Sequence, residues 1–150
     1  MDTVTYPDAK VTEFIEQHFS AARVRTKDNP QLLKEYSVSW TPNVVITDTD
    51  GTVHYRVEGF LQPHEFLARL SLGAGKFYLD HDRYDDAARR FEEVGERHAG
   101  SEAGAEGLYW LGVARFKKDH DKSQLQTSWQ RLAQDYPDSV WTQRSKIPKA

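Results

Sequence analysis

Histidines and acidic turns are the side chains of this sequence that could hold a metal ion. Six His residues occur, and no two of them have the spacing of about two to five residues that zinc sites use. They are His18, His54, His64, His81, His98 and His120. The run Asp48-Thr49-Asp50-Gly51 begins like a calcium loop but lacks the later ligands, so it predicts a hairpin turn. Asp80-His81-Asp82 falls at a predicted helix end, where acidic turns are ordinary. We therefore expect no metal site and no cofactor.

Cysteine chemistry is missing from these 150 residues, because the sequence contains no Cys. Structural disulfides and thiolate metal sites are excluded. No side chain of the chain can form a mixed disulfide, so we expect no catalytic residue for redox chemistry.

Composition limits the partners. Hydrophobic residues make up 38% of the chain and charged residues 29%, which is typical of a globular protein in water. The formal charge is −3 and no run of Lys or Arg occurs, so we expect neither nucleic acid nor a membrane surface as a partner. No stretch approaches the ~20 apolar residues of a membrane span. Residues 1–20 do not look like a signal peptide, so the expected location is cytoplasmic.

The elements that would position a site lie between Tyr36 and Leu70. The apolar run Val44-Val45-Ile46 predicts a buried strand over 43–48. Alternation over 53–58 predicts a second strand with one wet face. That wet face would carry His54, Arg56 and Glu58. Gly59 ends the strand, and Pro63 suits the first position of a helix that includes Phe66 and Leu70.

The N-terminal segment predicts two helices around a short strand. Asp8 can cap a helix with an apolar face formed by Val11, Phe14, Ile15 and Phe19. Residues 22–26 alternate as a strand would, with Val24 on one side. Asn29-Pro30 then predicts the start of a short helix.

After Leu70 the apolar spacing is helical to the end of the chain. Phe91, Val94 and Ser101 recur as Trp129, Leu132 and Ser139, at an offset of 38 residues. This near-repeat predicts stacked helical hairpins, with Gly73-Ala74-Gly75 as the joint before them. We expect Val44–Ile46, Phe66, Leu70, Phe91 and Trp129 to be buried, and no strand after residue 75.

Trp40-Thr41-Pro42, followed by Val44–Ile46 and the Asp48–Gly51 turn, resembles the C-terminal half of a thioredoxin. In that family the proline is cis, and its backbone faces the active-site cysteines and pairs with substrate peptide. The resemblance therefore implies a cis Thr41–Pro42 bond and a peptide-binding role for Trp40, Thr41 and Pro42. Met1–Asp8 resembles the segment that follows the cysteine pair. The resemblance thus implies an α/β thioredoxin-like fold that lacks the N-terminal strand and the Cys-x-x-Cys motif.

The helical region resembles tetratricopeptide repeats, with Gly75, Ala87 and Phe91 at the small and large positions of the repeat. The whole chain is therefore similar to bacterial thioredoxin-family proteins with C-terminal tetratricopeptide-like hairpins. On this interpretation residues 1–72 are the C-terminal part of a thioredoxin-like domain, and residues 73–150 are an all-α region of tetratricopeptide-like helical hairpins.

Two functions remain open. The chain is either a redox-inactive module that binds a protein or peptide partner, or the truncated form of a thiol–disulfide oxidoreductase whose cysteines lie upstream of Met1. Without the central strand of the family, the edges of the sheet are unpaired. We therefore also expect a homodimer in which these strand edges pair between two chains.

Overall fold

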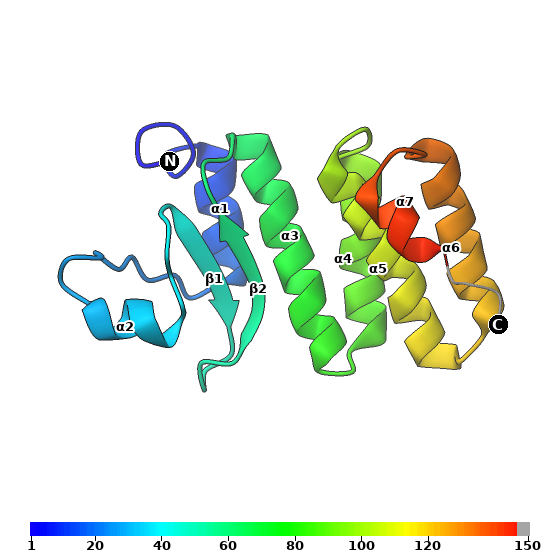
Figure 1. The fold of residues 1–150 in the computed structure, drawn as a ribbon, viewed down its shortest axis with the longest axis horizontal. Coiled ribbons are helices and arrows are strands. Elements are labelled where there is room, and N and C mark those ends of the chain that lie inside the picture. Colours follow the sequence, from blue (N-terminus) through cyan, green and yellow to red (C-terminus); the bar gives the residue numbers. More distant parts are fainter. Residues whose placement is uncertain (147–150) are drawn as a thin grey trace. The chain divides into compact units, whose positions relative to one another are not determined.

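In the computed structural model residues 1–146 are described, and they form seven helices and one two-stranded sheet (Figure 1). The elements are α1 (Ala9–His18), α2 (Pro30–Glu35), β1 (Asn43–Thr47), β2 (Val53–Glu58), α3 (Pro63–Asp80), α4 (Tyr84–Arg97), α5 (Glu102–Asp119), α6 (Lys122–Asp135) and α7 (Val140–Ser145). The chain divides into two units. The first holds residues 1–45 and 56–67, and the second holds residues 46–55 and the chain from 68 onward. No helix of the described part is long and apolar enough to cross a membrane.

In the first unit, the N-terminal turn is tied to the segment before α3. The Thr5 hydroxyl, which is fully buried, donates to the Leu61 carbonyl at 2.5 Å. The ring of Tyr6 meets that of Phe66 edge-on at 5.8 Å, and Phe66 is buried as expected. Asp8 caps α1 by accepting from the backbone N–H groups of Lys10 and Val11. Helix α1 therefore begins where the capping residue predicts.

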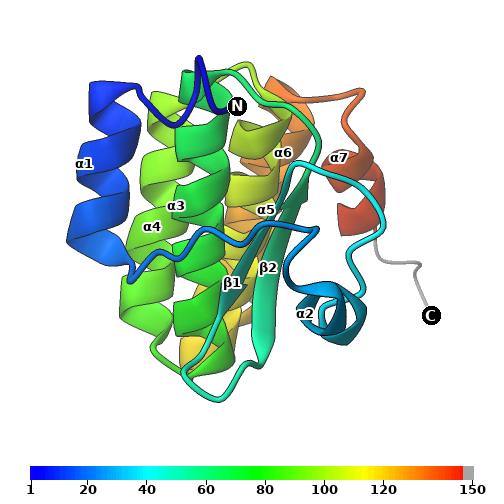
Figure 2. The ribbon, with the colours of Figure 1, turned by 90° about the vertical axis from the view of Figure 1, so that its left-hand side faces the viewer.

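The strand predicted at residues 22–26 is wrong. Residues 22–25 have no regular secondary structure and Thr26 lies in a turn, and Figure 2 shows the segment as a plain coil between α1 and α2. All of its residues are exposed, with Val24 at 42%. A strand of the predicted length needs a neighbour and an apolar face, and one Val flanked by two Arg supplies too little apolar surface to hold it there.

The hairpin of β1 and β2 closely matches the predicted strands at 43–48 and 53–58. At the turn, the Asp48 amide donates to the Thr52 carbonyl at 3.0 Å, and Gly51 has φ +89°. At the open end, the Gly59 amide donates to the Pro42 carbonyl at 2.8 Å. Only Ile46 of the apolar run is fully buried, while Val44 and Val45 are half-buried. Because the sheet has two strands, β1 has a strand on one edge only, and the full burial expected of Val44 and Val45 is wrong.

Gly73 and Gly75 do not form a joint, because α3 runs unbroken through them to Asp80. A Cβ on Gly73 would lie 2.1 Å from Cδ1 of Ile46, and a Cβ on Gly75 would lie 2.5 Å from Cε1 of Phe91. These glycines therefore serve the close approach of packed elements within the second unit. The expected boundary at residue 72 falls inside this continuous helix.

The second unit is built on a helical core with no strand among residues 76–146, as expected. Helices α4, α5 and α6 lie side by side (Figure 1). Phe91, Val94 and Leu132 are completely inaccessible in this core, and Leu70 is buried as well. Trp129 is half-buried, which corrects the expected full burial. Its indole stacks on Tyr109 at 5.1 Å and donates to the Tyr109 carbonyl, so one side of the ring is free to face water.

Candidate functional site

The loop before β1 is fixed by Arg56, which lies on β2. Its guanidinium donates to Oδ1 of Asn43 at 3.0 Å and to the carbonyl of Tyr36. At the end of α2, the amide of Val38 donates back to the carbonyl of Leu33 at 2.8 Å. The loop is therefore held at both of its ends within the first unit. Arg56 is half-buried, although the sequence pattern places it on a wet face.

Trp40, Thr41 and Pro42 lie at the tip of this loop, directly before β1. Trp40 is 67% exposed, Thr41 is exposed and Pro42 is half-buried. The Thr41–Pro42 bond is cis, the isomer that the resemblance implies. This segment carries no titratable side chain, so it can offer a contact surface and backbone hydrogen bonds but no acid–base chemistry.

A second exposed aromatic, Phe60, lies at the same end of the hairpin and was missed in the sequence. It is 53% exposed and follows Gly59, whose amide bonds to the Pro42 carbonyl. Phe60 belongs to neither the alternating pattern of β2 nor the helical spacing of α3. An apolar residue outside both patterns could have been recognised in the sequence as a candidate exposed aromatic. Trp40 and Phe60 are thus two large exposed aromatic residues at one end of the hairpin.

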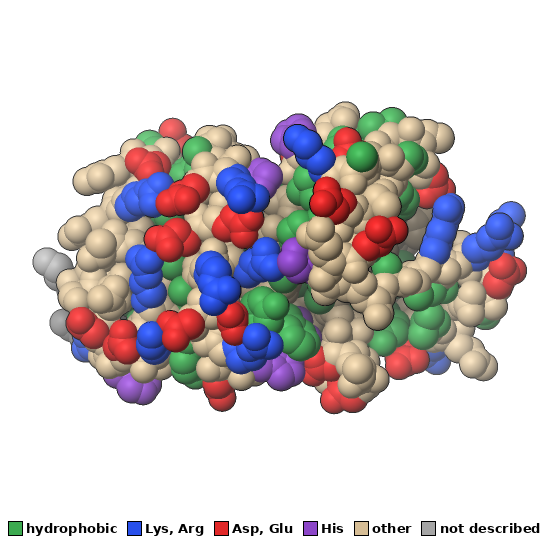
Figure 3. Space-filling model, turned by 180° about the vertical axis from the view of Figure 1, so that it is seen from behind, with side chains coloured by type: hydrophobic (Ala, Val, Ile, Leu, Met, Phe, Trp, Pro, Cys, Tyr) green, Lys and Arg blue, Asp and Glu red, His purple; other side chains and the backbone are tan. Residues whose placement is uncertain are grey.

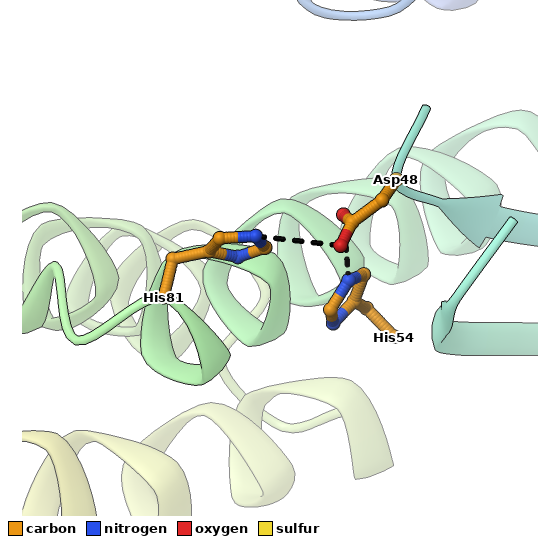
Figure 4. Close-up of side chains that lie close together, drawn as sticks. All are labelled: Asp48, His54 and His81. Carbon is orange, nitrogen blue, oxygen red and sulfur yellow. Dashed lines mark hydrogen bonds and ion pairs between the residues drawn. The ribbon is translucent and has the colours of Figure 1, made fainter. Parts of the chain in front are cut away.

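A polar cluster occupies the turn end of the hairpin in the second unit (Figure 4). His54 is only 5% exposed at its side chain, so its predicted place on a wet face is wrong. Its Nδ1 lies 2.8 Å from Oδ2 of Asp80, and its Nε2 lies 2.8 Å from Oδ1 of Asp48. Nε2 of His81 lies 3.4 Å from Oδ2 of Asp48. The ring of Phe77 covers His54 edge-on at 5.3 Å.

The charge state of His54 is set by opposing effects. Burial of the ring lowers the pKa of His54, but hydrogen bonds to Asp80 and Asp48, together with the two negative charges, outweigh burial. The net result is a pKa above the ordinary value for histidine.

A buried trio of Tyr55, Arg69 and Glu106 forms a second polar group in the same unit. Nη1 of Arg69 lies 2.6 Å from Oε2 of Glu106, and the Tyr55 hydroxyl donates to the same oxygen at 3.3 Å. Burial raises the pKa of Tyr55 to about 12, with the Glu106 charge adding to the effect. Burial also raises the pKa of Glu106, against the opposing effect of Arg69. The trio joins β2, α3 and α5, with the Glu106 side chain 7% exposed, the Arg69 side chain 28% exposed and Tyr55 half-buried.

Charges elsewhere do not gather by sign on the face shown in Figure 3, where Lys and Arg alternate with Asp and Glu.

Comparison with known proteins identifies one similarity. The family model described as a thioredoxin-like domain matches residues 2–74, a range that includes Trp40–Pro42, the hairpin and the start of α3. No curated protein and no solved structure matches the chain.

Proposed function

We propose that the thioredoxin-like domain matched at residues 2–74, with its small two-stranded sheet, binds an extended peptide segment of a protein partner at Trp40, Thr41 and Pro42. The observation that carries this proposal is the exposure of Trp40, at 67%. Tryptophan is enriched at the centres of protein interfaces and is seldom left this exposed without a partner.

The area offered is large enough to matter for binding. An exposure of 67% corresponds to roughly 170 Å² of a Trp surface of about 250 Å². Covering that area is worth up to ~4 kcal/mol at about 25 cal/mol per Å². Part of this is lost to the cost of association, so removal of the Trp40 ring should cost about 2 kcal/mol.

The backbone beside Trp40 supplies the second half of the proposed contact. Strand β1 follows Pro42 directly and has a neighbouring strand on one edge only among the described residues. An extended peptide can add to such an edge through main-chain hydrogen bonds, while exposed aromatics hold its side chains. Trp40 and Phe60 are at the end of the hairpin where such a peptide would enter.

Binding without redox exchange follows from the composition. The 150 residues contain no Cys, so their side chains cannot attack a substrate disulfide.

The helices from α3 to α6 are proposed as two tetratricopeptide-like hairpins, α3 with α4 and α5 with α6, and α7 follows them. Ser101 caps α5 by accepting from the Gly104 amide, and Ser139 caps α7 by accepting from the Trp141 amide. These two caps are 38 residues apart, which supports a repeated unit.

The test is selection of peptides from a random phage-displayed library on the purified chain, followed by calorimetry with the selected peptide. Trp40→Ala should weaken binding about 30-fold, as expected for the loss of about 2 kcal/mol. Val140→Ala is the matched control, because Val140 is 50% exposed on α7 and lies outside the proposed site. It should leave the affinity unchanged. Equal binding by wild type and Trp40→Ala would contradict the proposal, as would a selection that yields no binder.

A further inference from the structure

Three potential metal ligands from different elements meet at the turn end of the hairpin. Asp48 follows β1, His54 lies on β2 and His81 follows the last residue of α3. Each offers a ligand atom, and these atoms all lie within 4.8 Å of one another. Figure 4 shows both imidazoles directed at the Asp48 carboxylate. All three residues belong to the second unit.

The other nitrogen of each ring is already engaged. Nδ1 of His54 lies 2.8 Å from the Asp80 carboxylate, and Nδ1 of His81 lies 2.7 Å from the Phe77 carbonyl. Both partners are acceptors, so each Nδ1 carries the proton. Metal-binding histidines are held in this way, with one ring N–H donated to a carboxylate or a carbonyl and the other nitrogen free for the ion.

This arrangement leaves two Nε2 atoms facing one carboxylate, at 2.8 Å from His54 and 3.4 Å from His81. In neutral rings these nitrogens present lone pairs to an anion, which is repulsive. Protonating His54 alone lets its Nε2 donate to Asp48 but leaves the Nε2 lone pair of His81 facing the carboxylate. Protonating both rings would place two cations with centroids 5.1 Å apart. A divalent cation bound by the three groups would accept the two lone pairs and would avoid two neighbouring imidazolium charges. We propose that Asp48, His54 and His81 bind a divalent transition-metal ion, with zinc as the best match.

The chemistry of the ligands selects zinc over calcium or magnesium. Two imidazoles and one carboxylate suit zinc, whereas calcium and magnesium take oxygen ligands. Metal–ligand distances of about 2.1 Å in a tetrahedron require ligand atoms ~3.4 Å apart. The pair of His81 and Asp48 already has a separation of 3.4 Å. The contact of His54 at 2.8 Å is to the other oxygen of Asp48, Oδ1, so zinc held through Oδ2 would also require the carboxylate or the His54 ring to shift.

The surroundings favour a cation that enters from solvent. The charged groups around the ligands include the Asp48 and Asp80 carboxylates, the Asp50 carboxylate, whose charge interacts with His54, and the Lys76 ammonium, which lies 3.6 Å from Asp80. With neutral histidines the cluster therefore has a net negative charge. The side chain of His81 is 38% exposed, so an ion can reach the ligands without unfolding the unit. Three protein ligands leave a fourth position for water.

The test uses tag-free protein, freed of metal with a chelator, and zinc chloride as the only added ligand. Calorimetry should show one zinc ion per chain, and magnesium should not bind. His81→Gln removes an accessible ligand and should weaken zinc binding tenfold or more. His64→Gln is the matched control, because His64 is exposed on α3 and outside the cluster. Asp80→Asn keeps all three ligands and should weaken zinc binding about 10–100-fold by releasing the His54 ring.

Imidazole nitrogen NMR spectra of the wild type give a second readout that needs no variant. Zinc should shift the Nε2 signals of His54 and His81 before those of any other histidine. The proposal is overturned if the wild type binds no zinc, if His81→Gln binds as tightly as His64→Gln, or if zinc shifts other histidines first.

Discussion

Replacing Arg69 by Met should destabilise the second unit by leaving the Glu106 carboxylate buried without its cation. The Glu106 side chain is 7% exposed, and the Arg69 guanidinium lies 2.6 Å from it. Breaking a buried pair from one side costs about 3–5 kcal/mol. The lower end applies here, because the Arg69 side chain is 28% exposed and water already screens part of the interaction. We therefore expect a loss of about 3 kcal/mol at neutral pH, or roughly 6–12 °C in melting temperature.

The loss should depend on pH in a defined direction. Burial raises the pKa of Glu106 in the wild type, and removal of Arg69 raises it further because the Arg69 charge is the largest of the effects that lower it. A carboxyl group with a raised pKa in the folded state favours folding below its ordinary pKa, and that contribution is lost as pH rises through the folded value. The deficit of Arg69→Met should therefore be small in acid and grow towards neutral pH.

Urea denaturation followed by circular dichroism at several pH values measures both effects. Arg89→Met is the matched control, because Arg89 pairs with Asp86 at 2.9 Å on the surface with a side chain 75% exposed. A surface pair of this kind contributes about 0–1 kcal/mol. The interpretation of the trio is refuted if Arg69→Met costs no more than Arg89→Met, or if its deficit does not change with pH.

Three further predictions concern packing, alkaline stability and redox activity. Gly104→Ala places a Cβ 2.6 Å from the His98 carbonyl oxygen. The overpacking should cost about 1–3 kcal/mol and outweigh a helix-propensity gain of at most about 1 kcal/mol, so the variant should be less stable. A urea midpoint at or above that of the wild type would contradict this prediction. The pKa of Tyr55 is raised to about 12, so its contribution to stability is present below pH ~10 and lost as pH rises through the folded value. As pH rises through this range, Tyr55→Phe should lose less stability than the wild type. Urea midpoints of the two proteins that fall in parallel with pH would refute this prediction. Insulin reduction by dithiothreitol should be no faster with the chain present, since it has no Cys, and a rate rising with protein concentration would overturn this.

The hairpin could be predicted because its signals are local. All of them lie within the 17 residues from 43 to 59. They are a run of β-branched residues, the Asp48–Gly51 turn and the break at Gly59. The strand at residues 22–26 failed because a strand depends on a partner that local alternation does not reveal. Alternation in β2 also predicts which residues share a face, but it does not show which side chains pack over that face. His54 is therefore buried against Phe77 where a wet position was predicted.

Distant contacts explain the other differences. A glycine in a helical pattern can either end the helix or allow close packing, and the sequence does not distinguish the two. In the structure Gly73 and Gly75 allow the close approach of Ile46 and Phe91. His54 and His81 are 27 residues apart, so no ligand spacing marks them in the sequence. The loop of Trp40, Thr41 and Pro42 could be predicted as a site because a family resemblance supplied it. Phe60 lies outside every pattern and required the exposure of its side chain to be seen.

The measurement that tests the central claim most directly is amide NMR of the ¹⁵N-labelled chain during titration with a selected peptide. The proposed function predicts the largest shift changes at Trp40, Thr41, the first residues of β1 and Phe60, with small changes in α4 to α7. Changes confined to the helices at 84–145, with Trp40 and β1 unmoved, would contradict the claim that this loop and strand edge bind the partner.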